Sequence, residues 1–299
     1  MSATIPRVVV VTRATDYARL LETHGTRQQA RFFLETRGRS IEEVESWHHR
    51  FERALHEVTN AIPLAWRRSR VDRGDLDRFL FEPDDAVVVV GQDGLVANVA
   101  KYLDGQPVVG INPMPGFFDG VLVPHSPAEA RGLVPAAMHR EAHVEARTMV
   151  QVDLDDGQQL VALNELYLGH RTHQSSRYRL RVGDREERHS SSGLIVATGT
   201  GATGWARSIC RPLAEPPPVP QPTDPWLTFL VREAFPSKAT GTELTSGQIM
   251  AGCPLLVVSE LNEGGVVFGD GIEEDRLDFG WGRSATIRVA DRRLALVKG

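Results

Sequence analysis

The chain has 299 residues, of which 41% are hydrophobic and 24% charged, and its formal net charge is -5. This length predicts a sizeable core and two domains. The acidic balance disfavours a nucleic-acid-binding protein, since phosphate backbones are bound by basic surfaces. No run is apolar for long enough to cross a bilayer, and the N-terminus lacks a signal-peptide pattern. We therefore expect a cytoplasmic protein with neither membrane nor nucleic-acid partners.

Apolar β-branched runs alternate with amphipathic stretches over the first third of the chain. The pattern predicts strands at 7–13, 86–90 and 106–112, and helices at 17–34, 41–58 and 95–103. Ser40 precedes the second helix and Glu43 follows three residues later, as in a capping box. The elements from 86 to 112 form a βαβ unit. The N-terminal part is therefore expected to be an α/β domain with a parallel sheet.

The texture of the sequence changes at about Met149. Short strand-like runs separated by turn residues continue to the C-terminus, which is typical of a β-rich domain. The segment Pro212–Pro225 is rich in proline and is expected to be an extended loop. We predict an α/β nucleotide-binding domain at 1–130, joined by the last C-terminal residues, and a β-rich domain at 131–299.

The first motif that carries chemistry is GQDG, which follows the strand at 86–90. Ligands collect at the carboxyl ends of strands in open α/β sheets, and the N–H groups at a helix N-terminus attract anions. The turn of Gly91, Gln92 and Gly94 could therefore face a phosphate. Asp93 could orient a hydroxyl, accept its proton or hold Mg²⁺. An ordinary Asp-Gly turn is an equally good interpretation.

The second motif, GINPMPGFFDG, follows the strand at 106–112. Asn112 ends the strand, and the proline and glycine residues after it require an irregular loop. Phe117 and Phe118 are candidates to stack on a nucleotide base. Packing of these aromatic rings in the core is the alternative, and the sequence favours it.

The third motif is the pair Asn164 and Glu165, a polar step within the apolar run LVALNELYLGH, which we expect to form one strand. An adjacent amide and carboxylate can hydrogen-bond a base edge or ribose hydroxyls. Solvated side chains on an edge strand explain the pair equally well.

The fourth motif lies in GLIVATGTGATGWARS, where Gly199, Gly201 and Gly204 have the G-x-G-x-x-G spacing of a dinucleotide-binding turn. That turn requires a second strand ending in Asp or Glu about 20 residues later. The proline-rich segment occupies this position, which excludes the dinucleotide-binding turn. We expect instead a threonine- and glycine-rich nucleotide loop, whose glycines provide permissive backbone beside phosphate or ribose.

Two histidine pairs were weighed as metal ligands. His139 and His143 are one helical turn apart, but the glutamate between them is misplaced for a zinc-protease motif. His170 and His173 have no further Cys or His partners at zinc spacing. We expect these histidines to be solvated and predict no metal-ligating residue.

Taken in order, GQDG, GINPMPGFF, the Asn164–Glu165 pair and TGTGATGW resemble motifs of the NAD kinase family. That family has GGDG, GIN-x-G-x-x-GF, NE and T-P-T-G-S-T-A-Y at the matching places. The segment GGVVFGDGIEEDRLDF, with Asp270 and Gly271, looks like its late strand and turn. The resemblance covers the chain from about Ala86 onward. It implies an NAD kinase-like two-domain fold with an active site in the cleft between the domains, and a homo-oligomer.

The activity implied by this resemblance is ATP-dependent phosphorylation of the adenosine 2′-hydroxyl of NAD to NADP, with Mg²⁺ bridging the donor phosphates. Asp93 would be the catalytic residue, as a general base or as a hydroxyl-orienting group. The small-molecule nucleotide substrates would be bound by Gly91, Gln92, Gly94, Asn112, Phe117, Asn164, Glu165, Thr198, Thr200, Gly201, Thr203 and Trp205.

The sequence departs from the family pattern at three informative positions. Gln92 adds a side chain where the family has glycine, Ser192 stands where it has an acidic residue, and Trp205 replaces tyrosine. The acceptor could therefore be another small hydroxyl compound, such as a sugar or a lipid. A catalytically weak NAD- or nucleotide-binding regulatory protein is the second alternative.

Overall fold

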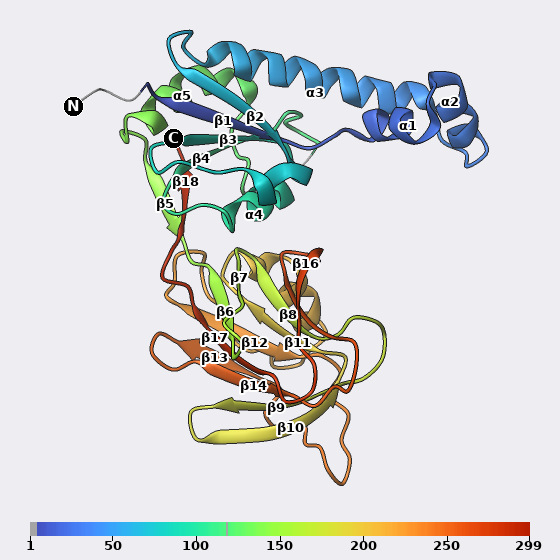
Figure 1. The fold of residues 1–299 in the computed structure, drawn as a ribbon, viewed down its shortest axis with the longest axis vertical. Coiled ribbons are helices and arrows are strands. Elements are labelled where there is room, and N and C mark those ends of the chain that lie inside the picture. The colour runs from blue at the N-terminus through green and yellow to red at the C-terminus, as the bar shows by residue number, and fades with distance from the viewer. Residues whose placement is uncertain (1–4, 118) are drawn as a thin grey trace. The chain divides into compact units, whose positions relative to one another are not determined.

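The computed structural model describes residues 5–117 and 119–299, so Phe118, one of the two candidate stacking residues, lies outside the described part. The chain divides into two units, one made of 1–145 and 295–299 and the other of 146–294 (Figure 1). The first unit extends beyond residue 130 because helix α5 (Ala130–Met138) packs on its sheet.

A six-stranded sheet with the order β2, β1, β3, β4, β18 and β5 forms the centre of the first unit. The strands are β1 (Arg7–Thr12), β2 (Arg67–Asp72), β3 (Ala86–Val90), β4 (Pro107–Ile111), β5 (Val144–Arg147) and β18 (Leu294–Val297). β1 pairs in parallel with β2 and β3, and β4 pairs in parallel with β3 and β18. Every residue of β3 and β4 is buried, as expected for a parallel sheet covered on both faces.

Helices cover both faces of this sheet (Figure 1). On one face, α3 (Ile41–Ala61) and α5 bury Phe51, Leu55 and Val134 against alternate residues of β1, β3 and β4. On the other face lies α4 (Asp93–Ala100), which begins directly after the turn that follows β3. The βαβ arrangement expected from the sequence is therefore present.

The region between β1 and α3 was predicted as one helix but forms two, α1 (Asp16–His24) and α2 (Arg27–Glu35). Gly25, with a φ of 76°, ends α1 in a conformation that suits glycine. Both helices share a small apolar cluster with the first turns of α3, and they extend beyond the sheet in Figure 1. Ser40 caps α3 by accepting a hydrogen bond from the Glu43 N–H at 3.3 Å.

The second unit is a sandwich of two six-stranded sheets whose inner faces share one hydrophobic core. The first sheet has the order β10-β9-β14-β17-β6-β7, and the second has the order β13-β12-β11-β8-β15-β16. The strands are β6 (Val150–Leu154), β7 (Gln159–Ala162), β8 (Glu165–His170), β9 (Ser176–Val182), β10 (Arg185–Ser191), β11 (Leu194–Ala197), β12 (Trp226–Val231), β13 (Ser246–Met250), β14 (Leu255–Ser259), β15 (Gly265–Gly269), β16 (Ile272–Asp278) and β17 (Ser284–Val289). The predicted fold class, an α/β domain followed by a β-rich domain, is confirmed.

One strand prediction was wrong in a way that matters for the site. The run LVALNELYLGH divides into β7 and β8, and Leu163 and Asn164 turn the chain from one sheet into the other. The carboxylate of Asp270 accepts hydrogen bonds from the N–H groups of Leu163 at 2.9 Å and Asn164 at 2.6 Å. The polar pair is therefore a corner between two strands.

Candidate functional site

The predicted catalytic carboxylate lies at the carboxyl edge of the parallel sheet. Asp93 opens α4, and its Oδ1 accepts hydrogen bonds from the N–H groups of Leu122 at 2.8 Å and Val123 at 3.3 Å. Its Oδ2 accepts a further bond from the N–H of Val121 at 3.0 Å. Because a carboxylate oxygen has two lone pairs, Oδ2 keeps room for one more donor. Asp93 thus holds the loop after β4 and can still orient a hydroxyl.

Asn112 and Phe117 belong to the loop after β4. This loop lies near Asp93 because β3 and β4 are parallel neighbours and end at the same edge of the sheet. Asn112 is 5% exposed, and its Oδ1 accepts a hydrogen bond from the Met114 N–H at 2.9 Å, which shapes the turn. Phe117 is 58% exposed. The expectation that this ring packs in the core was therefore wrong, and the ring contacts Trp47 and Arg50 of α3.

Three loops that are distant in the sequence meet at one end of the second sheet of the sandwich. Ala197 at the end of β11 pairs with Glu165 at the start of β8, and Gly269 at the end of β15 pairs with Leu166. The threonine loop, the Asn164–Glu165 corner and the turn at Asp270 therefore lie side by side. The N–H of Asp270 donates to the carbonyl of Glu165 at 3.1 Å, which ties two of these loops together.

Thr198 connects the threonine loop to the Asn164–Glu165 corner through hydrogen bonds. It is fully buried, its hydroxyl donates to the Leu163 carbonyl at 2.6 Å, and its N–H donates to the Asn164 carbonyl at 2.9 Å. The same hydroxyl accepts bonds from the N–H groups of Thr200 and Gly201 at 3.1 and 3.2 Å. Thr198 therefore shapes the loop, whereas Thr203 and Gly204, which follow, are exposed.

The glycines of this loop have a structural role that the spacing did not reveal. A Cβ on Gly201 would lie 2.1 Å from the Asn164 carbonyl oxygen, and one on Gly199 would lie 2.0 Å from the Gln221 carbonyl oxygen. Both glycines therefore allow close backbone contact within this unit. That these glycines also lie beside phosphate or ribose stays a prediction.

Arg147 contacts the threonine loop and was missed by the sequence reasoning. Its side chain is almost fully buried, and Nη1 donates to the Thr200 hydroxyl at 3.3 Å. A buried guanidinium supplies positive charge beside the threonine loop. A lone arginine at the end of β5 carried no motif that could have pointed to it.

Glu165 has unusual electrostatics for a half-buried carboxylate. Burial raises the pKa of Glu165 to about 7, and the nearby carboxylate of Asp270 raises it in the same direction. Near neutral pH the side chain is therefore divided between a protonated form, which donates a hydrogen bond, and an ionised form, which only accepts. Both forms can contact a ribose hydroxyl.

The substitution Glu165→Gln tests the raised pKa of Glu165 through the pH dependence of the free energy of unfolding. The folded state holds a proton that the unfolded state releases, so wild-type stability falls as the pH rises from about 4.5 to 7. We expect the difference in the free energy of unfolding, variant minus wild type, to increase by up to about 3 kcal/mol between pH 4.5 and pH 8. Urea unfolding at several pH values measures this. A Glu263→Gln control, at an exposed site, should show no such gain; an equal gain in both variants contradicts the assignment.

Trp205, another predicted nucleotide contact, packs within its own unit. It begins helix α6 (Trp205–Cys210), and its ring stacks on Tyr167 with centroids 5.9 Å apart and planes 10° apart. The guanidinium of Arg232 lies 5.0 Å from the ring centre. These contacts fix α6 to the outer face of the second sheet of the sandwich. Trp205 therefore has a packing role in this unit, and its contact with a nucleotide stays a prediction.

The histidines weighed as metal ligands differ from one another in exposure. His173 is exposed, but His170 is 6% exposed, and its Nδ1 accepts a hydrogen bond from the Thr172 N–H at 3.1 Å. The expectation that His170 is solvated was therefore wrong. Among the described residues, no group of three or more His, Cys, Asp or Glu side chains could hold a metal ion. None of the helices described is long and apolar enough to cross a membrane.

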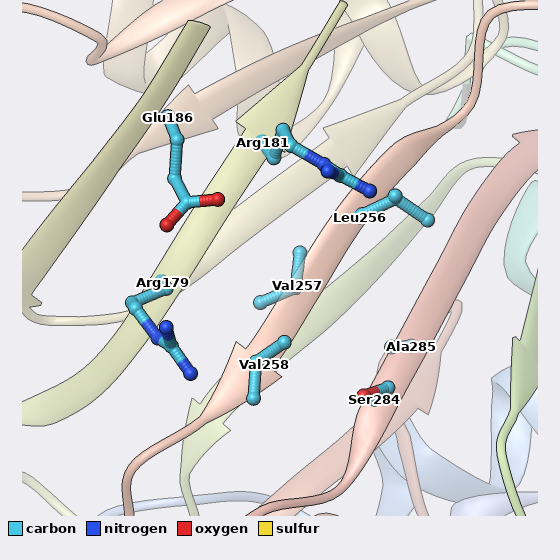
Figure 2. Close-up of a pocket in the computed structure, with 8 residues that line it drawn as sticks. All are labelled: Arg179, Arg181, Glu186, Leu256, Val257, Val258, Ser284 and Ala285. Carbon is cyan, nitrogen blue, oxygen red and sulfur yellow. The ribbon is translucent and has the colours of Figure 1, made fainter. Parts of the chain in front are cut away.

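A shallow pocket of about 290 Å³ lies on the outer face of the first sheet of the sandwich. Figure 2 shows Arg179, Arg181 and Glu186 above a floor that includes Leu256 and Val258. None of the site residues predicted from the sequence lines it. Glu260 lies 3.5 Å from Arg179 and further reduces the positive charge there. The residues predicted from the sequence are therefore separate from this pocket, with Asp93 in the first unit and the Asn164–Glu165 corner in the second.

The curated proteins to which this chain is similar include several NAD kinases. No protein-family model matches the chain. The NAD kinase of Methanoculleus marisnigri is 36% identical over 135 residues, which are 44% of this chain and 48% of that protein. NAD kinase 2, mitochondrial, of Rattus norvegicus is 27% identical over 260 residues, which cover 70% of this chain and 61% of that protein. The match to the first of these relatives spans about half of its length.

The structural likeness extends over nearly the whole chain. The crystal structure of an NAD kinase from Archaeoglobus fulgidus in complex with ATP covers 98% of this chain and 93% of its own, with a TM-score of 0.59. The two sequences are 21% identical in this alignment. At that identity the likeness concerns the fold, including both the α/β unit and the sandwich.

Proposed function

Because the chain is a divergent relative of the NAD kinases in sequence and in fold, we propose that it is a phosphotransferase that phosphorylates the adenosine 2′-hydroxyl of NAD with ATP to give NADP. The observation that carries the proposal is the meeting of three separate motifs at one corner. The N–H of Thr198 binds the Asn164 carbonyl, and the Asp270 carboxylate binds the Asn164 N–H. These hydrogen bonds support a shared nucleotide-binding role for the three motifs of the second unit.

Each proposed site residue has a role that follows from its geometry. Asp93 orients the acceptor hydroxyl through the remaining lone pair of Oδ2. Phosphoryl transfer has a loose transition state, so positioning and charge neutralisation contribute more than full removal of the hydroxyl proton. Asn164 and Glu165 hold the ribose or base of the nucleotide through their amide and carboxyl groups. Arg147 and the threonine loop stabilise phosphate charge.

In this proposal Mg²⁺ is bound to the phosphate donor, ATP. Kinases commonly bind Mg²⁺ through substrate phosphates and one or two carboxylates, and retain water in the remaining positions. The described residues contain no larger cluster of ligands. We therefore treat the Mg²⁺ complex of ATP as the substrate, and the resident residues contact its phosphates and the acceptor.

One observation favours a second candidate function, a kinase for another hydroxyl compound. The exposed side chain of Gln92 projects from the turn before α4, where the related family has glycine. It narrows the space for a phosphate or changes the shape of the acceptor site. A different acceptor, such as a sugar or a lipid, would use the same Asp93 to orient its hydroxyl.

Release of ADP across a panel of acceptors separates the two candidates. The purified chain is incubated with ATP and Mg²⁺ and with NAD, NADH, hexoses, diacylglycerol or no acceptor. We expect ADP release above the no-acceptor rate with NAD or NADH. Stimulation by a sugar or lipid alone would show that the acceptor is not NAD. Equal rates throughout would contradict the proposal of a kinase.

A further inference from the structure

A long loop closes one edge of the sandwich in the second unit. It comprises residues 232–245, joins β12 to β13 and contains no helix or strand of its own. The loop leaves the second sheet and lies along β10, which is the edge strand of the first sheet. The N–H of Phe235 donates to the Ser190 carbonyl at 2.8 Å, and the N–H of Gly241 donates to the Arg188 carbonyl at 3.0 Å. We call this loop the strap, because it pairs with backbone groups that an edge strand would otherwise expose.

The carboxylate of Glu187 on β10 holds the end of the strap. Its Oε1 accepts a hydrogen bond from the N–H of Glu243 at 3.2 Å, and its Oε2 accepts one from the N–H of Leu244 at 2.8 Å. Leu244 is buried in the core of the sandwich. Gly241 lies so close to the same carboxylate that a Cβ there would overlap it. Hydrogen bonds to an ionised acceptor are the stronger kind, so the closed strap depends on this carboxylate.

A fully buried histidine lies beside this carboxylate. His189 follows Glu187 by two residues on β10, is 0% exposed, and places its Nε2 3.2 Å from Oε2 of Glu187. Neither ring nitrogen has a hydrogen-bond partner within the part of the chain that the structure describes. Tyr178, the residue opposite on β9, stacks on the ring with centroids 5.5 Å apart, and its hydroxyl is bonded to that of Ser191 at 2.9 Å. Of these neighbours, Glu187 alone carries a negative charge that could pair with an imidazolium.

The electrostatics of this cluster oppose protonation of the histidine while the strap is closed. Burial lowers the pKa of His189 below its usual value, and the negative charge of Glu187 opposes this effect without cancelling it. Tyr178 stays uncharged, because burial raises its pKa, and the side chain of Glu243 is exposed to solvent. A protonated ring needs either water or a free carboxylate. The closed strap excludes the first and already uses the second.

We propose that the strap is a pH-sensitive closure of the sandwich edge, which is closed while His189 is neutral and opens when His189 takes up a proton. The strap begins at Arg232, whose guanidinium lies 5.0 Å from the centre of the Trp205 ring and donates to the Ser192 carbonyl at 3.3 Å. Opening therefore occurs next to α6, the helix that follows the threonine loop. An effect on phosphoryl transfer would rest on the proposed function, whereas opening of the strap does not.

Hydrogen exchange of the full chain, followed by NMR, measures this opening directly. The readout is the protection factor of the Glu243 and Leu244 N–H groups, which is corrected for the intrinsic exchange rate at each pH. The open state binds a proton near the usual histidine pKa of about 6.5, and the closed state binds it only at lower pH. Closure is therefore complete above about pH 6.5 and is lost as the pH falls, by about tenfold in protection for one pH unit. Measurement from pH 7.5 to 5.5 keeps ordinary carboxylates ionised.

Two variants of His189 remove the titration. In His189→Phe, which keeps a ring against Tyr178, and in His189→Gln, the protection factors of the strap should stay constant from pH 7.5 to 5.5. The matched control is His173→Gln, at an exposed histidine of the same unit, and it should keep the fall seen in the wild type. Glu187→Gln should lower the protection about tenfold at every pH, because two charge-assisted hydrogen bonds become neutral ones.

Three results would overturn the inference. The first is a wild-type protection factor that is the same at pH 7.5 and at pH 5.5, and the second is an undiminished fall in the His189 variants. The third is an equal fall at the N–H groups of β11, in the middle of the second sheet, which would indicate global unfolding in place of a local opening. Failure of the proposed function is separate, since NADP would then form at no pH although the strap still opened in acid.

Discussion

Asp93→Asn is expected to lower the rate of NADP formation about 100-fold or more, because the acceptor hydroxyl loses the carboxylate that orients it. An asparagine can keep the Oδ1 bonds to the N–H groups of Leu122 and Val123, so the loop after β4 stays near its place. Its NH₂ group, however, would face the N–H of Val121 in place of Oδ2. The rate is measured by a coupled NADP-dependent dehydrogenase assay, and NAD affinity is measured by calorimetry.

Asp84→Asn is the matched control, because Asp84 is an exposed carboxylate of the same unit. We expect the control to keep the wild-type rate and the Asp93 variant to keep its affinity for NAD. A variant that turns over NAD as fast as the wild type would remove Asp93 from the mechanism. If wild type and variant are equally inert while both bind NAD, the protein is a nucleotide-binding protein and not a kinase.

Gly201→Ala is expected to be strongly destabilising for the second unit. The added Cβ would lie 2.1 Å from the Asn164 carbonyl oxygen, which is backbone and cannot move aside like a flexible side chain. We expect the free energy of unfolding to fall by about 3 kcal/mol, as in severe overpacking. The threonine loop should also move away from the Asn164–Glu165 corner, and phosphorylation of NAD should be lost.

Gly280→Ala serves as the comparison, because a Cβ on Gly280 has no atom within 4 Å. Chemical unfolding and the NADP assay are applied to both variants. The control should differ from the wild type by less than about 1 kcal/mol. Equal stability of the Gly201 and Gly280 variants would show that the close approach to Asn164 is not a constraint on this fold.

The elements that the sequence predicted well are those whose environment is uniform along their length. β1, β3 and β4 are runs of buried, mostly β-branched residues, and such runs are typical of the centre of a parallel sheet. β2, with the sequence RRSRVD, was missed because it is an edge strand with one partner and exposed arginines. Local composition reports burial, and an edge strand is only partly buried.

The Asn164–Glu165 corner depends on contacts that no local pattern contains. The strand is interrupted between β7 and β8, where the N–H groups of Leu163 and Asn164 donate hydrogen bonds to the Asp270 carboxylate. Asp270 lies more than 100 residues later in the sequence. The order of the motifs and the resemblance to a family connected segments that hydrogen bonds join in the second unit, and the functional roles of their residues stay predictions. The roles of Thr198 and Arg147 depend on burial and on partners, which spacing does not encode.

The most direct test of the central claim is a ³¹P NMR spectrum of NAD after incubation with the wild-type chain, ATP and Mg²⁺. The account predicts a new phosphomonoester signal from the adenosine 2′-phosphate of NADP, together with the signals of ADP. A spectrum in which ATP is consumed and NAD is unchanged, or in which both remain unchanged, would contradict it.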